Sequence, residues 1–68
     1  MRQEDINRNF TYHPPKEGQP QMYTDIRDKA KELAEMINGI CPDGREKSLA
    51  MTKLEESVMW ANASIARS

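Results

Sequence analysis

The residues best suited to binding chemistry lie on the first long helix that the sequence predicts. Tyr23, Arg27 and Lys31 follow one another at intervals of four residues, so they share one flank of that helix. Arginine and lysine bind phosphate oxygens, and an aromatic ring stacks on a base. This flank therefore suits a ligand that carries both phosphate and a flat base.

The alternative is an ordinary solvated helix surface. Lys29 lies on the opposite flank from Arg27, and the sequence offers two i, i+4 ion pairs, Asp25–Lys29 and Lys31–Glu35. Spacing alone leaves both interpretations open.

A second aromatic candidate lies in a proline-rich loop. Residues 11–20 contain three prolines and one glycine, which excludes a helix interior. A loop stiffened by Pro14 and Pro15 loses little freedom on binding, so Tyr12 or His13 there would supply a ring at a small ordering cost. The alternative is that Tyr12 only covers the core.

The sequence predicts no enzyme. The serines of the second long helix are distant in sequence from His13, the only histidine, and nothing brings Cys41 next to it as a dyad. Glu55 and Glu56 diverge by about 100° on a helix and favour a solvated face. We expect no catalytic residue, no metal site and no cofactor, because one cysteine and one histidine do not make the usual four-ligand zinc site.

Length and charge restrict the remaining classes. A chain of 68 residues forms at most one domain with a small core, and one cysteine allows no intrachain disulfide. Oligomerisation is the remaining source of stability. A net charge of −1 argues against a nucleic-acid polymer as partner. We expect no membrane span and no signal peptide, and the lone cysteine favours a reducing, cytosolic environment.

The chain is predicted to be all-α, with an amino-terminal arm over residues 1–19 and an αα-hairpin over residues 20–68. Residues 1–9 are polar and either form a short helix docked by Ile6 and Phe10 or fray. The first long helix should run from about Pro20 to Asn38, where Gly39 supplies a left-handed cap. Its core stripe comprises four residues: Ile26, Ala30, Leu33 and Ile37.

The second long helix should run from about Gly44 to Ala66. Asp43 and Glu46 have the spacing of a capping box at its start, and the short connection makes the two helices antiparallel. One apolar stripe of this helix should pack on the first helix, namely Ala50, Leu54, Val58, Ala61 and Ile65.

The opposite face of the second helix is apolar too. It carries Leu49, Met59, Trp60 and Ala63, and a bare apolar patch of this kind marks an interaction surface. We expect self-association of the chain through this face. The alternatives are an amino-terminal segment that folds back over it, or a small helical interaction module or inhibitor that uses Leu49, Met59 and Trp60 against another protein.

Several segments together resemble a known family. They are residues 10–15 (FTYHPP), the pair Ile26-Arg27, residues 30–34, residues 41–43 (CPD), and the carboxy-terminal blocks 45–55 and 58–67. These segments look like the hairpin domain shared by phage anti-CBASS nucleotide sponges and some phage anti-Thoeris sponges. The resemblance covers about residues 10 to 67.

The resemblance implies a function that composition does not show. Members of this family bind cyclic oligonucleotide immune signals in the cytoplasm of the infected bacterial host and sequester them without cleavage, so CBASS effectors are not activated. The family forms compact homohexamers. Cyclic dinucleotides lie between protomers, and cyclic trinucleotides can occupy separate pockets.

The resemblance also implies roles for individual residues. Tyr12 matches the loop tyrosine that stacks on a base, and Arg27 matches a basic residue that contacts phosphate, with Lys31 one turn further on. Lys29 is the reserve for that position. His13 and Arg67 are candidates for the trinucleotide pocket, whereas Trp60 matches a block that is buried in the assembly.

Overall fold

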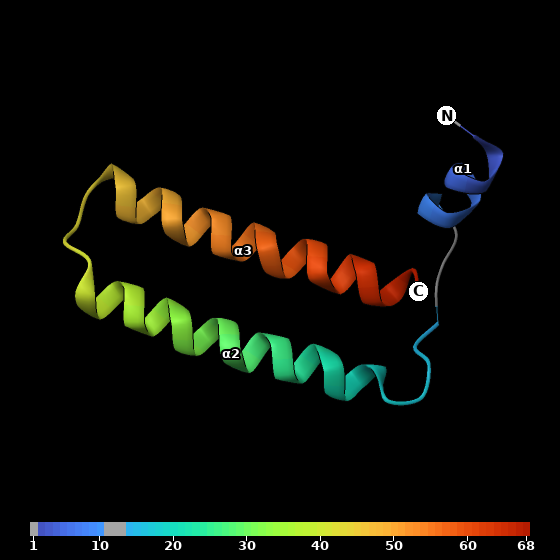
Figure 1. Cartoon of the computed structure of the whole chain (residues 1–68), viewed down its shortest axis with the longest axis horizontal. Helices are drawn as coiled ribbons and strands as arrows, with labels where there is room; N and C mark the ends of the chain where they lie inside the picture. Colours follow the sequence, from blue (N-terminus) through green and yellow to red (C-terminus); the bar gives the residue numbers. More distant parts are fainter. Residues whose placement is uncertain (1, 11–13) are drawn as a thin grey trace.

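The computed structural model describes residues 2–10 and 14–68 of the chain. Three helices make up this part, and no strand occurs in it: α1 (Gln3–Phe10), α2 (Gln19–Ile40) and α3 (Arg45–Ala66). Figure 1 shows α2 and α3 lying antiparallel, with α1 set apart beyond the end where α2 begins and α3 finishes. The prediction of an all-α helical hairpin is confirmed.

The amino-terminal arm forms the short helix α1. Arg2, which precedes the helix, forms an ion pair at 2.9 Å with Glu4 of the first turn. Ile6 stays exposed, and within the described residues the helix–helix contacts join α2 and α3 only. In the single chain, α1 is therefore not docked onto the hairpin through Ile6. The division into an arm of residues 1–19 and a hairpin of residues 20–68 stays a prediction.

Helix α2 begins one residue earlier than expected. Gly18 precedes it with φ 84° and ψ −15°, a left-handed conformation that glycine adopts without the steric penalty of a Cβ. Pro20 lies in the first turn, as predicted, where its missing N–H leaves no helical hydrogen bond unmade.

The predicted stop at Gly39 is wrong. The helix continues through Gly39 to Ile40, and the N–H of Cys41 donates to the carbonyl of Ile37 at 2.9 Å. Cys41 then turns extended, with φ −86° and ψ 133°. This is the conformation that Pro42 imposes on the residue before it, so the proline ends the helix and no left-handed glycine is needed.

The predicted capping box at the start of α3 is also wrong. The helix begins at Arg45 with Gly44 as its N-cap, and no side chain caps it. The Asp43 carboxylate instead accepts a hydrogen bond from Lys47 Nζ at 2.9 Å. The same ammonium donates to the carbonyl of Asn38 at 3.1 Å. Lys47 therefore joins the end of α2, the connection and the first turn of α3.

The two long helices form a single layer. The shortest dimension of the molecule is 11 Å, which is about one helix diameter. Ile26, Ala30 and Ile37 are half-buried as expected, whereas Leu33 is 45 % exposed and the prediction that it joins the core is wrong. Two helices share only one line of contact, so no apolar side chain of the described residues is fully buried.

Within the described part of the chain, no helix combines the length and the apolar character that crossing a bilayer requires.

The Lys47 contacts predict a measurable contribution to stability. The Lys47 side chain is 14 % exposed, so its hydrogen bonds are poorly replaced by water. Lys47→Met keeps the alkyl stem and removes the ammonium, and should lower the free energy of unfolding by about 1–2 kcal/mol. Urea denaturation at a fixed protein concentration measures the change.

Lys53→Met is the matched control, because Lys53 lies on the same helix and makes an exposed pair with Glu56 at 3.5 Å. Its effect should stay within about 0.5 kcal/mol. Equal effects of the two substitutions would contradict the role assigned to Lys47.

Candidate functional site

A groove runs between α2 and α3 on one flank of the hairpin. It has a volume of about 420 Å³. Its apolar lining side chains are all half-buried and come from both helices: Ala30, Ala34, Met51, Leu54 and Val58. Three exposed charged residues complete the lining: Arg27, Lys31 and Glu55. The groove thus combines an apolar surface with charges of both signs.

The structure brings Arg27 and Lys31 to this groove together. They lie one turn apart on α2, as the sequence predicted, and within the described residues neither makes an ion pair. The predicted pair Lys31–Glu35 does not form. Two cations without a partner carboxylate, next to an apolar surface, can bind an anionic group that also carries an apolar or aromatic part.

Glu55 is the groove residue that sequence reasoning missed. It was interpreted with Glu56 as part of a solvated face, but only Glu56 is engaged elsewhere, with Lys53 at 3.5 Å. Glu55 directly follows Leu54, which belongs to the stripe predicted to contact α2. This position beside the helix contact is the feature of the sequence that could have indicated a groove residue. A carboxylate there can accept hydrogen bonds from the N–H groups of a ligand that the cations hold by its anionic part.

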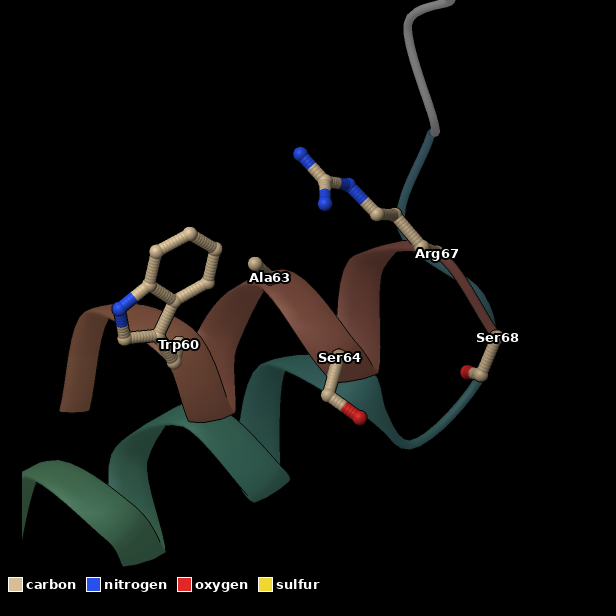
Figure 2. A pocket seen from close by; sticks show the side chains of 5 residues that line it. All are labelled: Trp60, Ala63, Ser64, Arg67 and Ser68. Carbon is tan, nitrogen blue, oxygen red and sulfur yellow. The ribbon is translucent and has the colours of Figure 1, made fainter. Parts of the chain in front are cut away.

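A second hollow lies at the carboxy-terminal end of α3. It has a volume of about 430 Å³ and is lined by Trp60, Ala63, Ser64, Arg67 and Ser68. Figure 2 shows the indole of Trp60 and the guanidinium of Arg67 projecting to the same side of α3, with Ala63 between them. The arrangement offers a ring face, a cation and two hydroxyl groups within one open site.

The other sequence-predicted residues have different surroundings. Tyr12 and His13 lie outside the described residues. Lys29 is exposed and pairs with Glu32 at 3.5 Å instead of with Asp25, and it does not line the groove. The structure thus places Arg27 and Lys31 together at the groove. It places Arg67, Trp60 and Ala63 together at the second hollow.

The predicted interaction face of α3 is bare in the single chain. Trp60 is 59 % exposed, and Leu49 and Met59 are exposed as well, whereas Ala63 is half-buried. Sequence reasoning missed a second apolar stripe, on α2, which comprises Met22, Leu33, Met36 and Ile40. At about 100° per residue these four side chains fall within about 60° of one another. Their helical spacing could have indicated this stripe, but the sequence analysis assigns Leu33 to the core, which leaves the stripe incomplete.

The described residues contain no group of three or more His, Cys, Asp or Glu side chains placed to hold a metal ion.

Comparison with known proteins identifies the family. Residues 2–66 match the Acb2/Tad1 hairpin domain. No curated protein and no solved structure matched the chain. The Acb2/Tad1 hairpin is a nucleotide-sponge domain, which binds its ligand and is not catalytic. The match extends over nearly the whole chain, and helices α2 and α3 form the antiparallel hairpin on which that domain is built. The protein therefore belongs to the Acb2/Tad1 hairpin-domain family.

Proposed function

We propose that this protein binds cyclic oligonucleotide immune signals and sequesters them intact, which blocks activation of CBASS effectors in the cytoplasm of the infected bacterial host. The observation that carries the proposal is the groove with Arg27 and Lys31 on a hairpin of a sponge family. Cyclic dinucleotides are the first ligand class, and cyclic trinucleotides are the second.

The groove supports this ligand chemistry step by step. Arg27 and Lys31 bind the phosphates of the cyclic backbone. Tyr12 stacks on a base, and the apolar lining of the groove covers the sugar and base surfaces. Glu55 accepts hydrogen bonds from base N–H groups. Every step is binding, so the ligand leaves the protein unchanged.

The second hollow supports a separate site for cyclic trinucleotides. Arg67 supplies a phosphate-binding cation there, and the neighbouring serine hydroxyls supply hydrogen bonds. His13 is the second proposed contact of this site. Lys29 is the alternative to Arg27 as the phosphate contact of the first site; because it does not line the groove, we propose Arg27, and substitution of each residue in turn distinguishes the two assignments.

We also propose that the chain acts as a closed homo-oligomer, a hexamer. A layer one helix thick with no fully buried apolar side chain leaves most of its apolar surface in water, and packing against other copies removes that exposure. The contact surfaces are the predicted α3 face (Leu49, Met59, Trp60 and Ala63) and the α2 stripe (Met22, Leu33, Met36 and Ile40). No residue of these two surfaces lines the groove, so the assembly can form with the groove still accessible.

The same exposed face favours one alternative function. An interaction module or inhibitor would use Leu49, Met59 and Trp60 to bind another protein. That protein would be a monomer or dimer in isolation with this face free, so the mass of the purified protein distinguishes the two functions.

The ligand site predicts specific losses on substitution. Tyr12→Ala and Arg27→Ala should each raise the Kd for a cyclic dinucleotide about ten- to a hundredfold, because each removes a stacking or charge-assisted contact. Isothermal titration with cyclic di-GMP, cyclic GMP–AMP and cyclic tri-AMP measures this change. Chromatography after heat denaturation should recover the ligand intact.

Lys29→Ala is the matched control for Arg27→Ala, because it removes a cation from the same helix outside the groove. Its Kd should equal that of the wild type. Unchanged binding by Arg27→Ala, or loss of the assembly in that variant, would reject the site, and a cleaved ligand would reject sequestration.

Self-association is tested at Trp60, the only tryptophan. Trp60→Glu places a charge in the proposed contact surface and should reduce the wild-type mass, measured by light scattering after size exclusion, towards that of a single hairpin. Wild-type tryptophan emission should shift to longer wavelength on dilution, as the indole becomes exposed to water.

Ser48→Glu adds the same charge on an exposed position of α3 on the groove side. It should leave the mass unchanged. A wild-type protein that is monomeric at all concentrations would refute the assembly and favour the interaction module.

A further inference from the structure

Glu55 adds a negative charge to a groove that otherwise suits an anion. It lines the α3 wall of the groove, whereas Arg27 and Lys31 line the α2 wall. All three side chains are exposed, and among the described residues none of the three forms an ion pair. A carboxylate here weakens the attraction of the groove for phosphate, because like charges repel. It favours binding only of a ligand that also presents hydrogen-bond donors.

Two hydrogen bonds between the helices define their register. Near one end of the hairpin, Lys47 Nζ on α3 donates to the carbonyl of Asn38 on α2 at 3.1 Å. Near the other end, Gln19 Nε2 on α2 donates to the carbonyl of Ile65 on α3 at 2.8 Å. The antiparallel helices (Figure 1) are therefore aligned on both sides of the groove.

This register places the carboxylate opposite the two cations. Lys31 lies across from Leu54, the residue before Glu55, and Arg27 lies one turn away, across from Val58. The two cations are about 6 Å apart along the axis of α2. A ligand that spans the groove therefore meets cations on the α2 side and an acceptor on the α3 side.

The two walls suit the two ends of a nucleotide. The phosphate is its anionic end, and the base is the end that carries hydrogen-bond donors. The groove volume of about 420 Å³ lies within the range of small-ligand sites, about 300–1,000 Å³. With the phosphate bound by Arg27 and Lys31, the edge of the base faces Glu55.

We propose that Glu55 selects guanine, so that the groove prefers cyclic dinucleotides that carry this base; the inference rests on the proposed function. An ionised carboxylate has acceptors only. Guanine presents two adjacent donors on its Watson–Crick edge, N1–H and the 2-amino group, and the two carboxylate oxygens can accept both. Adenine presents one donor there, next to the lone pair of N1, which a carboxylate repels. Glu55 therefore discriminates against adenine as well as binding guanine.

The test compares ligands that share one backbone and differ only in their bases. In isothermal titration, the wild type should bind cyclic di-GMP with a Kd about tenfold lower than that for cyclic di-AMP. Cyclic di-IMP should give an intermediate Kd, because hypoxanthine keeps N1–H and lacks the 2-amino group.

Glu55→Gln should change this preference. The amide has the size of the carboxylate but carries one acceptor and one donor group. It can therefore accept from the 6-amino group of adenine and donate to N1, whereas it places a donor against a donor of guanine. The Kd for cyclic di-GMP should rise about tenfold, and the Kd for cyclic di-AMP should fall about threefold.

Glu56→Gln is the matched control. Glu56 is the next residue of α3, does not line the groove, and pairs with Lys53 at 3.5 Å. The substitution removes the same charge from the same helix, so it controls for the overall electrostatic field. Both Kd values should stay within about twofold of the wild type, and their ratio should not change.

Failure of the inference and failure of the proposed function give different results. Equal wild-type Kd values for cyclic di-GMP and cyclic di-AMP, or tighter binding of cyclic di-AMP, would overturn guanine selection and leave sequestration intact. A guanine preference that persists in Glu55→Gln would overturn the role of Glu55. If the wild type binds none of the three ligands, the proposed function fails and the inference fails with it.

Discussion

The structure depends on one constraint: two helices packed side by side share a single line of contact. In this chain that contact leaves Ile26, Ala30, Leu54 and Val58 only half-buried, and no apolar residue of the described part is fully enclosed. A chain of 68 residues with one cysteine has no disulfide framework to compensate. Contacts at the ends of the hairpin therefore contribute to its stability, and the proposed assembly would add packing against other copies. The Lys47 and Gln19 contacts lie at opposite ends of the hairpin, where the helices would otherwise separate most easily.

The same geometry divides the hairpin into surfaces of different character. One flank carries the groove with Arg27, Lys31 and Glu55, whereas the apolar stripe with Met36 lies on another side of α2. Charged side chains resist burial against a protein surface unless they are paired, and exposed apolar stripes favour it. Ligand binding and self-association can thus use different sides of two helices.

The sequence predicted the helices well because hydrophobic spacing and proline positions are local signals. It failed where a residue's partner depends on the neighbouring helix. Gly39 has the sequence of a helix stop, but Pro42 ends α2 through Cys41. Asp43 has the spacing of a cap, but Lys47 takes its carboxylate. Leu33 belongs to the expected stripe, but the rotation of α2 against α3 exposes it. Arg27 and Lys31 were predictable as a pair from their spacing, whereas Glu55 became a site residue only when α3 was placed beside them.

A protein that sequesters a signal without chemistry must hold it for long periods, and differences in affinity between related complexes arise chiefly in the dissociation rate. Slow dissociation requires a site whose groups are already in place. A large domain fixes a loop by embedding its base in a core, but this hairpin has no such core. It instead fastens the segment that follows Pro14 and Pro15 to the carboxy-terminal end of α3 through two side chains, the buried amide of Gln19 and the ammonium of Lys16. Ile65 at this end lies two residues before Arg67, which lines the second hollow. This point of attachment thus lies close to the second hollow, whereas neither Gln19 nor Ile65 lines the groove of Arg27 and Lys31.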